Sequence, residues 1–209
     1  MQQAHGQTPG TGTPDHRAER AAQQMLRSID VKRQTIDSCM ADILAATDLI
    51  VAAFRSGNKL MLCGNGGSAA DCQHMAAEFT SRLTMDYERP GLPALALTTD
   101  SSFLTAFTND INFEEVFARQ VQALGRAGDV LLGISTSGSS KNVVCAMEMA
   151  QQMGIRTIAL TGNRGRLKEM VDVCIAVPSA QTPHIQETHL AIEHIICHLA
   201  ERDLFGYER

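Results

Sequence analysis

The stretch Cys63-Gly64-Asn65-Gly66-Gly67-Ser68 follows the apolar run 59–62 and directly precedes a helical pattern that carries His74 and Glu78. It predicts a strand, a glycine turn and the start of a helix. The glycines let the backbone turn sharply and let a ligand approach it closely. Ser68 is expected to cap the helix, whose free N–H groups favour an anion. The first hypothesis is therefore a phosphorylated ligand.

A second turn has the same chemistry. Ser135-Thr136-Ser137-Gly138-Ser139-Ser140 follows the apolar run 129–134. Its hydroxyl and backbone N–H groups are donors suited to phosphate. Two such turns in one domain predict one shared site. A third turn, Thr161-Gly162-Asn163-Arg164-Gly165, is explained more simply as an ordinary loop.

The fold class follows from five short runs that are apolar throughout, with little alternation: 59–63, 93–97, 129–134, 156–160 and 173–177. Such runs suit parallel strands that are buried on both faces. Helical patterns separate most of them, so we expect an α/β fold with a doubly wound, five-stranded parallel sheet flanked by helices. Ligands of such sheets bind beyond the carboxyl ends of the strands, where the turns lie.

The N-terminal part is organised differently. Residues 1–16 are rich in Gln, Gly, Thr and Pro and are expected to form a disordered tail, and residues 17–209 a single domain. Within 18–56, apolar residues recur at helical spacings, which favours a pair of amphipathic helices that could pack on another subunit.

Composition excludes several classes of function. A net charge of −5 gives no basic face for nucleic acid as a primary ligand. The six cysteines are scattered without a C-x-x-C pair, which indicates free thiols in a reducing cytoplasm. We find neither a signal-peptide pattern nor an apolar run of the roughly 20 residues that cross a membrane, so a cytoplasmic location is expected.

Ligand-capable side chains recur on two predicted helices. His74 and Glu78 are four residues apart and lie on one helix face, where they could hold a metal ion or form an exposed surface pair. The last helix, expected over 185–204, has His194 and His198 at the same spacing. That spacing alone would suit a metal pair, although one of these histidines is expected at the surface.

Four motifs in the same order now give a resemblance. They are C-G-N-G-G-S-A-A-D-C-Q-H-M-A-A-E-F from Cys63, T-N-D at 108–110, G-D-V-L-L-G-I-S-T-S-G-S-S at 128–140 and I-Q-E-T-H-L-A-I-E-H at 185–194. Together they resemble the phosphoheptose isomerases of the sugar isomerase (SIS) domain family, over about residues 20–205. That family converts sedoheptulose 7-phosphate to D-glycero-D-manno-heptose 7-phosphate for the lipopolysaccharide core.

The resemblance implies a set of residues that bind the sugar phosphate: Asn65, Gly66, Gly67, Ser68, Glu78, Asn109, Asp110, Ser135, Thr136, Ser137, Ser140 and Gln186. It also implies one zinc ion per subunit, in a homotetramer, with four ligands: His74, Glu78, Gln186 and His194. Glu78 would move a proton between the reacting carbons, and His194 would exchange protons with the oxygens or open the ring.

Helix geometry limits the metal set. Gln186 and His194 are eight residues apart, which is about 12 Å along a straight helix. They could share a metal only if their side chains lean toward one another or if the helix begins near Gln186.

Other readings of the same domain stay open. A non-catalytic adaptor of this family binds a replication initiator, but in that group the glycine turn and the helix acid are altered. This chain keeps Gly67, Glu78, Ser137 and His194, which favours the enzyme. A sugar-phosphate-sensing regulator would need a DNA-binding module. An isomerase for a pentose or hexose phosphate is the remaining alternative.

Overall fold

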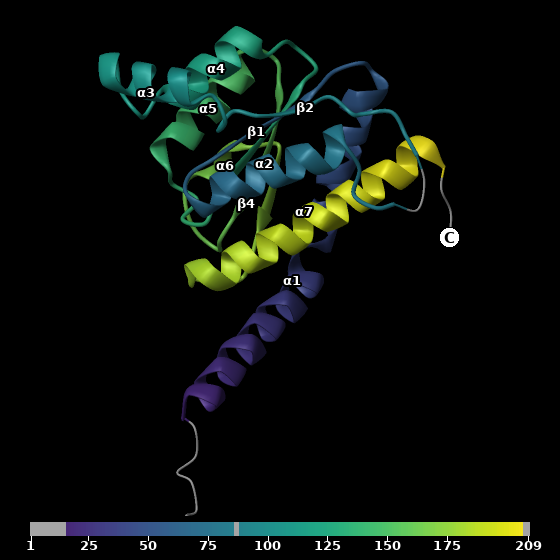
Figure 1. The fold of residues 1–209 in the computed structure, drawn as a ribbon, viewed down its shortest axis with the longest axis vertical. Coiled ribbons are helices and arrows are strands. Elements are labelled where there is room, and N and C mark those ends of the chain that lie inside the picture. The colour runs from purple at the N-terminus through teal and green to yellow at the C-terminus, as the bar shows by residue number, and fades with distance from the viewer. Residues whose placement is uncertain (1–15, 86–87, 207–209) are drawn as a thin grey trace, which may run out of the picture.

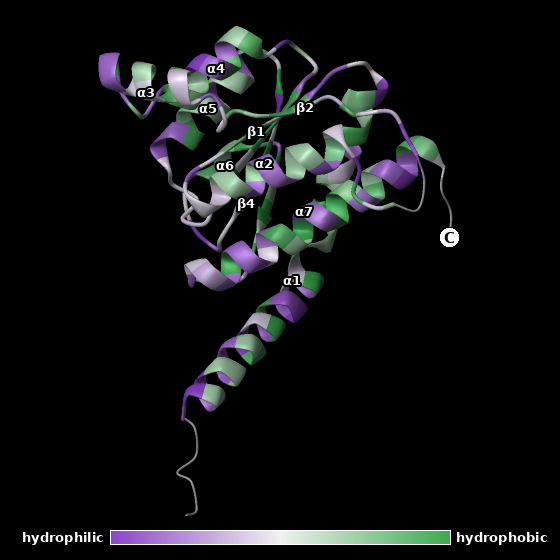
Figure 2. Ribbon diagram, viewed as in Figure 1, coloured by the Kyte–Doolittle hydropathy of each residue, from purple (hydrophilic) through white to green (hydrophobic). Residues whose placement is uncertain are grey.

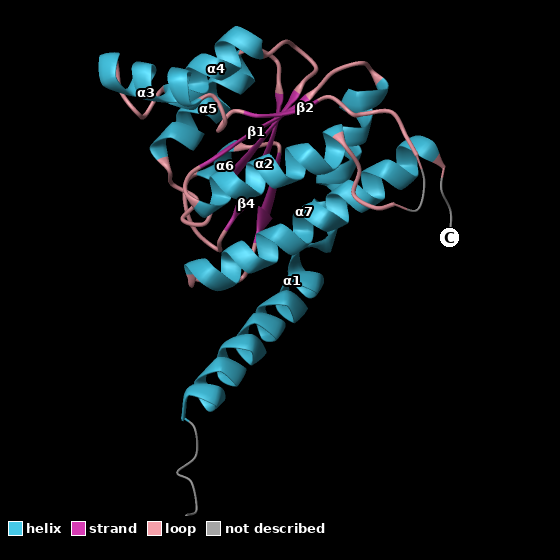
Figure 3. Ribbon diagram, in the orientation of Figure 1, coloured by secondary structure: helices cyan, strands magenta, loops and turns pink. Residues whose placement is uncertain are grey.

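The computed structural model describes residues 16–85 and 88–206 and contains one parallel sheet (Figure 3). The strands are β1 (Leu60–Gly64), β2 (Ala94–Ala96), β3 (Val130–Ser135), β4 (Arg156–Thr161) and β5 (Val173–Ala176). Their order is β2-β1-β3-β4-β5, and every neighbouring pair is parallel. The chain winds outward from β1 in one direction and from β3 in the other. The predicted doubly wound α/β fold is therefore confirmed.

Helices cover both faces of the sheet (Figure 1). They are α1 (His16–Arg55), α2 (Gly67–Thr80), α3 (Ser101–Asp110), α4 (Val116–Leu124), α5 (Lys141–Gln152), α6 (Leu167–Met170) and α7 (Thr182–Phe205). One apolar cluster joins the sheet to α1, α2 and α7. A second joins its other face to α4 and α5.

The expected pair of N-terminal helices is wrong, because α1 is one continuous helix of 40 residues. It contains neither glycine nor proline, so nothing in its sequence breaks it before Ser56-Gly57. The expected tail of residues 1–16 falls mostly outside the described residues. His16, at its end, is already the first residue of α1.

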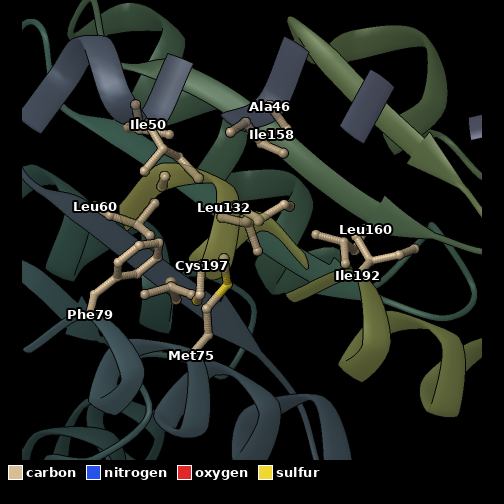
Figure 4. Packing of buried hydrophobic residues seen from close by; sticks show 14 of the residues in the cluster. Ala46, Ile50, Leu60, Met75, Phe79, Leu132, Ile158, Leu160, Ile192 and Cys197 are labelled. Atoms are coloured by element: carbon tan, nitrogen blue, oxygen red, sulfur yellow. The ribbon is translucent and has the colours of Figure 1, made fainter. Parts of the chain in front are cut away.

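Strand alternation supplies both cores. Leu60 and Leu62 of β1 face the α1, α2 and α7 side, whereas Met61 and Cys63 face α4 and α5. Figure 4 shows the first core, where Leu60 lies beside Phe79 and Leu160 beside Ile192. Burial on both faces explains why the strands are apolar throughout and could be recognised from the sequence.

The first half of α1 extends away from the sheet (Figure 1), although Gln24 and Ser28 in it still hydrogen-bond with His184 and Glu187 at the start of α7. Figure 2 shows apolar residues along the extended part, where Met25, Leu26 and Ile29 are exposed. An apolar groove of about 160 Å³ continues between α1 and α7 and is lined by Ile36, Met40 and Ile195, among other residues.

All six cysteines are free thiols, and Cys39, Cys63, Cys72 and Cys197 are buried. In the described part of the chain, no helix is both long and apolar enough to cross a bilayer.

Candidate functional site

Strand register brings the first two turns together. Gly64, the last residue of β1, pairs with Ile134 of β3, so Asn65 and Ser135 leave neighbouring strands at the same edge. Ser135 in turn pairs with Thr161, where the third turn begins. Because the chain reverses its winding between β1 and β3, this edge is the crevice in which ligands of doubly wound sheets bind.

The first turn starts α2 earlier than expected. Gly66 is the N-cap residue, with φ 57° and ψ −123°, and α2 begins at Gly67. Ser68 is therefore inside the helix and 5% exposed, and the expectation that it caps the helix is wrong. The Gln186 amide lies where a Cβ atom of residue 67 would be, so the glycine leaves room for this side chain over the turn. The first turn of α2 and the start of α7 are thus in direct contact.

The second turn gathers hydroxyl groups. The Ser135 Oγ atom lies 2.9 Å from Ser140 Oγ and 3.3 Å from Ser137 Oγ. The Ser139 N–H donates to Ser137 Oγ over 3.3 Å. Ser140 is the N-cap of α5, and its side chain makes no capping hydrogen bond. A helix N-terminus and clustered hydroxyls at one place form a site suited to an anion.

The third turn supports the second turn through its backbone. Gly165 meets the backbone of Gly138 so closely that neither position has room for a Cβ atom. The Leu167 N–H also donates to the Gly138 carbonyl (2.9 Å), and the Gly162 N–H to the Thr136 carbonyl (3.2 Å). The third loop therefore fixes the shape of the serine turn.

A pair of asparagines joins the first turn to the second. The Asn65 amide donates to Asn142 Oδ1, and the Asn142 amide donates to Asn65 Oδ1, each over 2.8 Å. Asn142 is the second residue of α5 and is 3% exposed. Sequence reasoning missed Asn142. Its position just after the serine turn is a weak signal that could have identified it.

The acid and the histidines of the predicted metal site come together from two helices. Ligand atoms of His74, Glu78 and His194 all lie within 4.8 Å of one another. The two histidine Nε2 atoms are 2.8 Å apart, and His74 Nε2 is 3.5 Å from Glu78 Oε1. The buried Glu78 Oε2 atom has no hydrogen-bond partner in the described structure. A zinc ion held at about 2.0–2.1 Å in a tetrahedron needs ligand atoms about 3.3 Å apart, so this donor set fits the ion.

Gln186 occupies a different place from His194. Because α7 begins at Thr182 and is continuous, the alternative of a helix that begins near Gln186 is excluded. The Gln186 amide lies over Gly67 and hydrogen-bonds the carboxyl of Asp71, one helical turn before His74. A shared metal would therefore require the long Gln186 side chain to turn from Asp71 toward His74 and His194.

Two carboxyl groups lie next to this cluster: Glu193 directly precedes His194 in α7, and Asp71 is one helical turn before His74 in α2. Burial raises the pKa of Glu193 to about 8, and the nearby charge of Asp71 adds to the rise. Burial also raises the pKa of Asp71, although its hydrogen bond with Gln186 opposes the shift. Both oxygens of Glu193 lack a hydrogen-bond partner in the described structure. Burial between α2 and α7 thus disfavours the charged form of both acids.

Other candidates lie apart from the cluster. His198 is exposed and accepts a hydrogen bond from Arg202 (2.8 Å), so the spacing-based pair of His194 and His198 does not form. Asn109 and Asp110 are exposed at the end of α3, where the Asn109 amide donates to Asp110 (2.9 Å). A role for these two residues in ligand binding stays a prediction.

Arg89, which sequence reasoning also missed, joins α2 to α7. Its guanidinium is fully buried, forms an ion pair with Glu201 of α7 and donates to the carbonyls of Glu78 (2.7 Å) and Phe79 (2.8 Å). The two helices that carry His74, Glu78 and His194 are therefore tied together at the end of α2. A lone arginine before a proline gives no pattern that would reveal this contact.

Comparison with known proteins agrees with this geometry. The family model described as "SIS domain" matches residues 22–162. A phosphoheptose isomerase of Roseiflexus is 55% identical over 179 residues, which are 85% of this chain and 90% of the relative.

Two solved structures are also similar. The phosphoheptose isomerase of Neisseria gonorrhoeae has a TM-score of 0.83 and 42% identity, over 88% of this chain and 98% of that one. The enzyme of Francisella tularensis has a TM-score of 0.85 and 36% identity over the same shares. The chain is therefore an isomerase with a SIS domain and belongs to the phosphoheptose isomerase family.

Proposed function

We propose that this isomerase converts sedoheptulose 7-phosphate to D-glycero-D-manno-heptose 7-phosphate. The observation that carries the proposal is the cluster of His74, Glu78 and His194 on the two helices that meet at the phosphate-type turns. His74 lies seven residues beyond Gly67, about 10 Å along α2. A phosphate at the turns and the reacting carbons at the cluster would thus be the two ends of one ligand.

The serine turn would hold the phosphate as a remote handle. The hydroxyls of Ser135, Ser137 and Ser140 and the first N–H groups of α5 are the donors. With Asn65, Gly66, Gly67, Ser68 and Thr136 around it, this end of the site would orient the sugar without reacting. Such fixed orientation lowers the barrier at the other end.

Proton transfer would take place at the cluster. A ketose becomes an aldose when a proton moves between adjacent carbons through an enediol, which needs a base near the carbons and an acid near the oxygens. We assign the first role to the carboxylate of Glu78 and the second to the imidazole of His194. Their helices hold them within reach of one substrate.

The residues that would hold zinc are His74, Glu78 and His194, with Gln186 as the fourth ligand if its side chain turns toward them. When bound, the ion would polarise the substrate carbonyl. A carboxylate fully bound to a metal is a poorer base, so we propose that Glu78 binds the ion loosely or leaves it during turnover.

The setting of the enzyme is also a proposal. Six free thiols suit the reducing cytoplasm, where the product would enter synthesis of the lipopolysaccharide core. The exposed apolar face of α1 supports assembly with further copies, as in the homotetramer that the family resemblance implies. The sugar phosphate is the partner molecule, and a net charge of −5 argues against nucleic acid.

The test is conversion of sedoheptulose 7-phosphate, followed by NMR, with the parent chain and Glu78→Gln. We expect heptose 7-phosphate from the parent, and a rate lower by about 10²–10⁴ for the variant because the base is lost. Metal content is measured on the same samples.

Normal rates for Glu78→Gln with unchanged metal content would contradict the role of Glu78. No conversion by a folded, zinc-loaded parent would contradict the enzyme itself and favour the adaptor reading. Pentose and hexose phosphates, tested alongside, separate the remaining isomerase alternatives.

A further inference from the structure

We propose that Asn142 is a positioning residue that sets which way the amide of Asn65 faces in the substrate site. Asn142 is buried, and its described polar contacts are with Asn65 and with the backbone of Val143. It would therefore act on the ligand through Asn65. The inference rests on the proposed function only in that Asn65 contacts the sugar phosphate.

The orientation starts from the backbone of α5. Val143 is the third residue of this helix, so its N–H is among the four that have no partner within the helix. It donates instead to Asn142 Oδ1 over 3.0 Å. An N–H donor needs an oxygen opposite it, so the reversed Asn142 amide would place two donors face to face. The helix N-terminus thus selects one orientation of Asn142.

That choice passes to Asn65. With Asn142 fixed, its Oδ1 accepts from the Asn65 amide and its Nδ2 donates to Asn65 Oδ1, each over 2.8 Å. A reversed Asn65 would lose both bonds and set oxygen against oxygen. Asn65 is half-buried, so it keeps one N–H and one carbonyl lone pair for a ligand, at places that the pair defines.

The pair also spans the crevice. Asn65 follows β1, and Asn142 opens the helix that follows the serine turn of β3. Two reciprocal bonds between them fix the first turn relative to the second. A ligand that contacts both turns would meet donors at fixed separations, which is the preorganisation that binding sites need.

A double-mutant cycle tests the proposal with sedoheptulose 7-phosphate as substrate. Asn65→Ala and Asn142→Ala should each raise KM roughly three- to tenfold, the loss expected for about one hydrogen bond. The KM of the double variant should not exceed the higher of the two single-variant KM values, because Asn142 acts through Asn65. Asn163→Ala, an exposed asparagine at the same edge of the sheet, is the matched control and should leave KM unchanged.

A second readout does not depend on turnover. The chain has six asparagines, so selective ¹⁵N labelling gives few side-chain amide signals. Asn142→Ser keeps an oxygen for the Val143 N–H, so it preserves the helix start if Asn142→Ala fails to fold. We expect it to shift the Asn65 side-chain signals while those of Asn163 stay in place.

The proposal is overturned if Asn142→Ala lowers the melting temperature but leaves KM unchanged, or if the two KM effects multiply in the double variant. Unchanged Asn65 signals in Asn142→Ser would also overturn it. A parent chain that converts no sedoheptulose 7-phosphate would contradict the proposed function instead, and the NMR result would still decide whether Asn142 orients Asn65.

Discussion

Ser137 presents an exposed hydroxyl beside Ser135 in the serine turn. Because the phosphate is proposed to be a handle away from the reacting carbons, Ser137→Ala should raise KM for the sugar phosphate about three- to tenfold and leave kcat nearly unchanged. Steady-state kinetics measure both constants. Ser139→Ala, in the same turn but outside the implied substrate set, is the control. An unchanged KM in Ser137→Ala would remove Ser137 from the phosphate site.

His189 is a buried imidazole whose charge state should affect stability. Its Nε2 donates to the Thr161 carbonyl (3.1 Å), and burial lowers its pKa from 6.5 to about 4. Between these values the unfolded chain binds a proton that the folded chain does not. The stability that depends on a neutral His189 is therefore complete above pH 6.5 and is lost as the pH falls toward 4. At pH 5 the free energy of unfolding is lower by about 2 kcal/mol.

His189→Gln removes this titrating group, so the free energy of unfolding of the variant should depend less on pH. Urea unfolding of the parent and the variant at pH 7, 6 and 5 measures the slope of the unfolding free energy. Equal slopes would show that His189 does not titrate differently in the two states. The slope against pH is the quantity to compare. The substitution also changes packing, but this shifts the free energy of unfolding equally at every pH and leaves the slope unchanged.

At the scale of the element, Arg89 holds α2 against α7. Arg89→Met leaves Glu201 in its buried place and leaves the carbonyls of Glu78 and Phe79 without their donor. Removing one partner of a buried ion pair costs about 3–5 kcal/mol, so we expect a loss of that order in urea unfolding.

The pair of substitutions gives the control. Arg89→Met combined with Glu201→Met removes both charges and should recover much of the stability, because apolar groups tolerate burial. A double variant as unstable as Arg89→Met would contradict this account of the pair.

The sequence predicted a helix or strand correctly where its burial in the fold leaves a pattern in consecutive residues. Strands buried on both faces are apolar at every position, so β1, β3 and β4 could be recognised within a residue or two. The length of α1 could not be judged from its apolar spacing. The same spacing of three, four and seven residues is expected of one long helix and of two shorter ones, so the pattern does not show where a helix ends.

The site was predictable where a motif carried it. His74 and Glu78 share a helix face by spacing, whereas the meeting with His194 depends on how α2 packs against α7. Ser68 is a preferred capping residue type, but Gly66, two residues earlier, takes the N-cap position with a backbone conformation (φ 57°) that suits glycine. Asn142 acts through a single partner 77 residues away, a contact with no periodicity to reveal it.

At the scale of the whole molecule, the uncovered apolar face of α1 should govern assembly. Ile36 is 60% exposed and lines the groove between α1 and α7. A charge at this position would be buried without a partner if another copy covers the groove. Ile36→Lys should therefore lower the particle mass measured by light scattering, from four copies to fewer.

Gln34→Lys provides the matched control, because Gln34 is an exposed polar residue on the same helix. It adds the same charge and should leave the mass unchanged. A full tetramer of Ile36→Lys would show that other surfaces join the copies. A monomeric parent at all concentrations would contradict the homotetramer.

The contact between Gly138 and Gly165 also limits which substitutions this chain can accept. A side chain at either position would collide with the backbone at the other. Because the partner is already a glycine, no substitution there could make room for it. The hydroxyls of Ser135, Ser137 and Ser140 contact one another through their side chains, so these positions are not restricted to glycine in the same way. Descendants of this chain could therefore change the ligand that the turn accepts while both glycines stay the same.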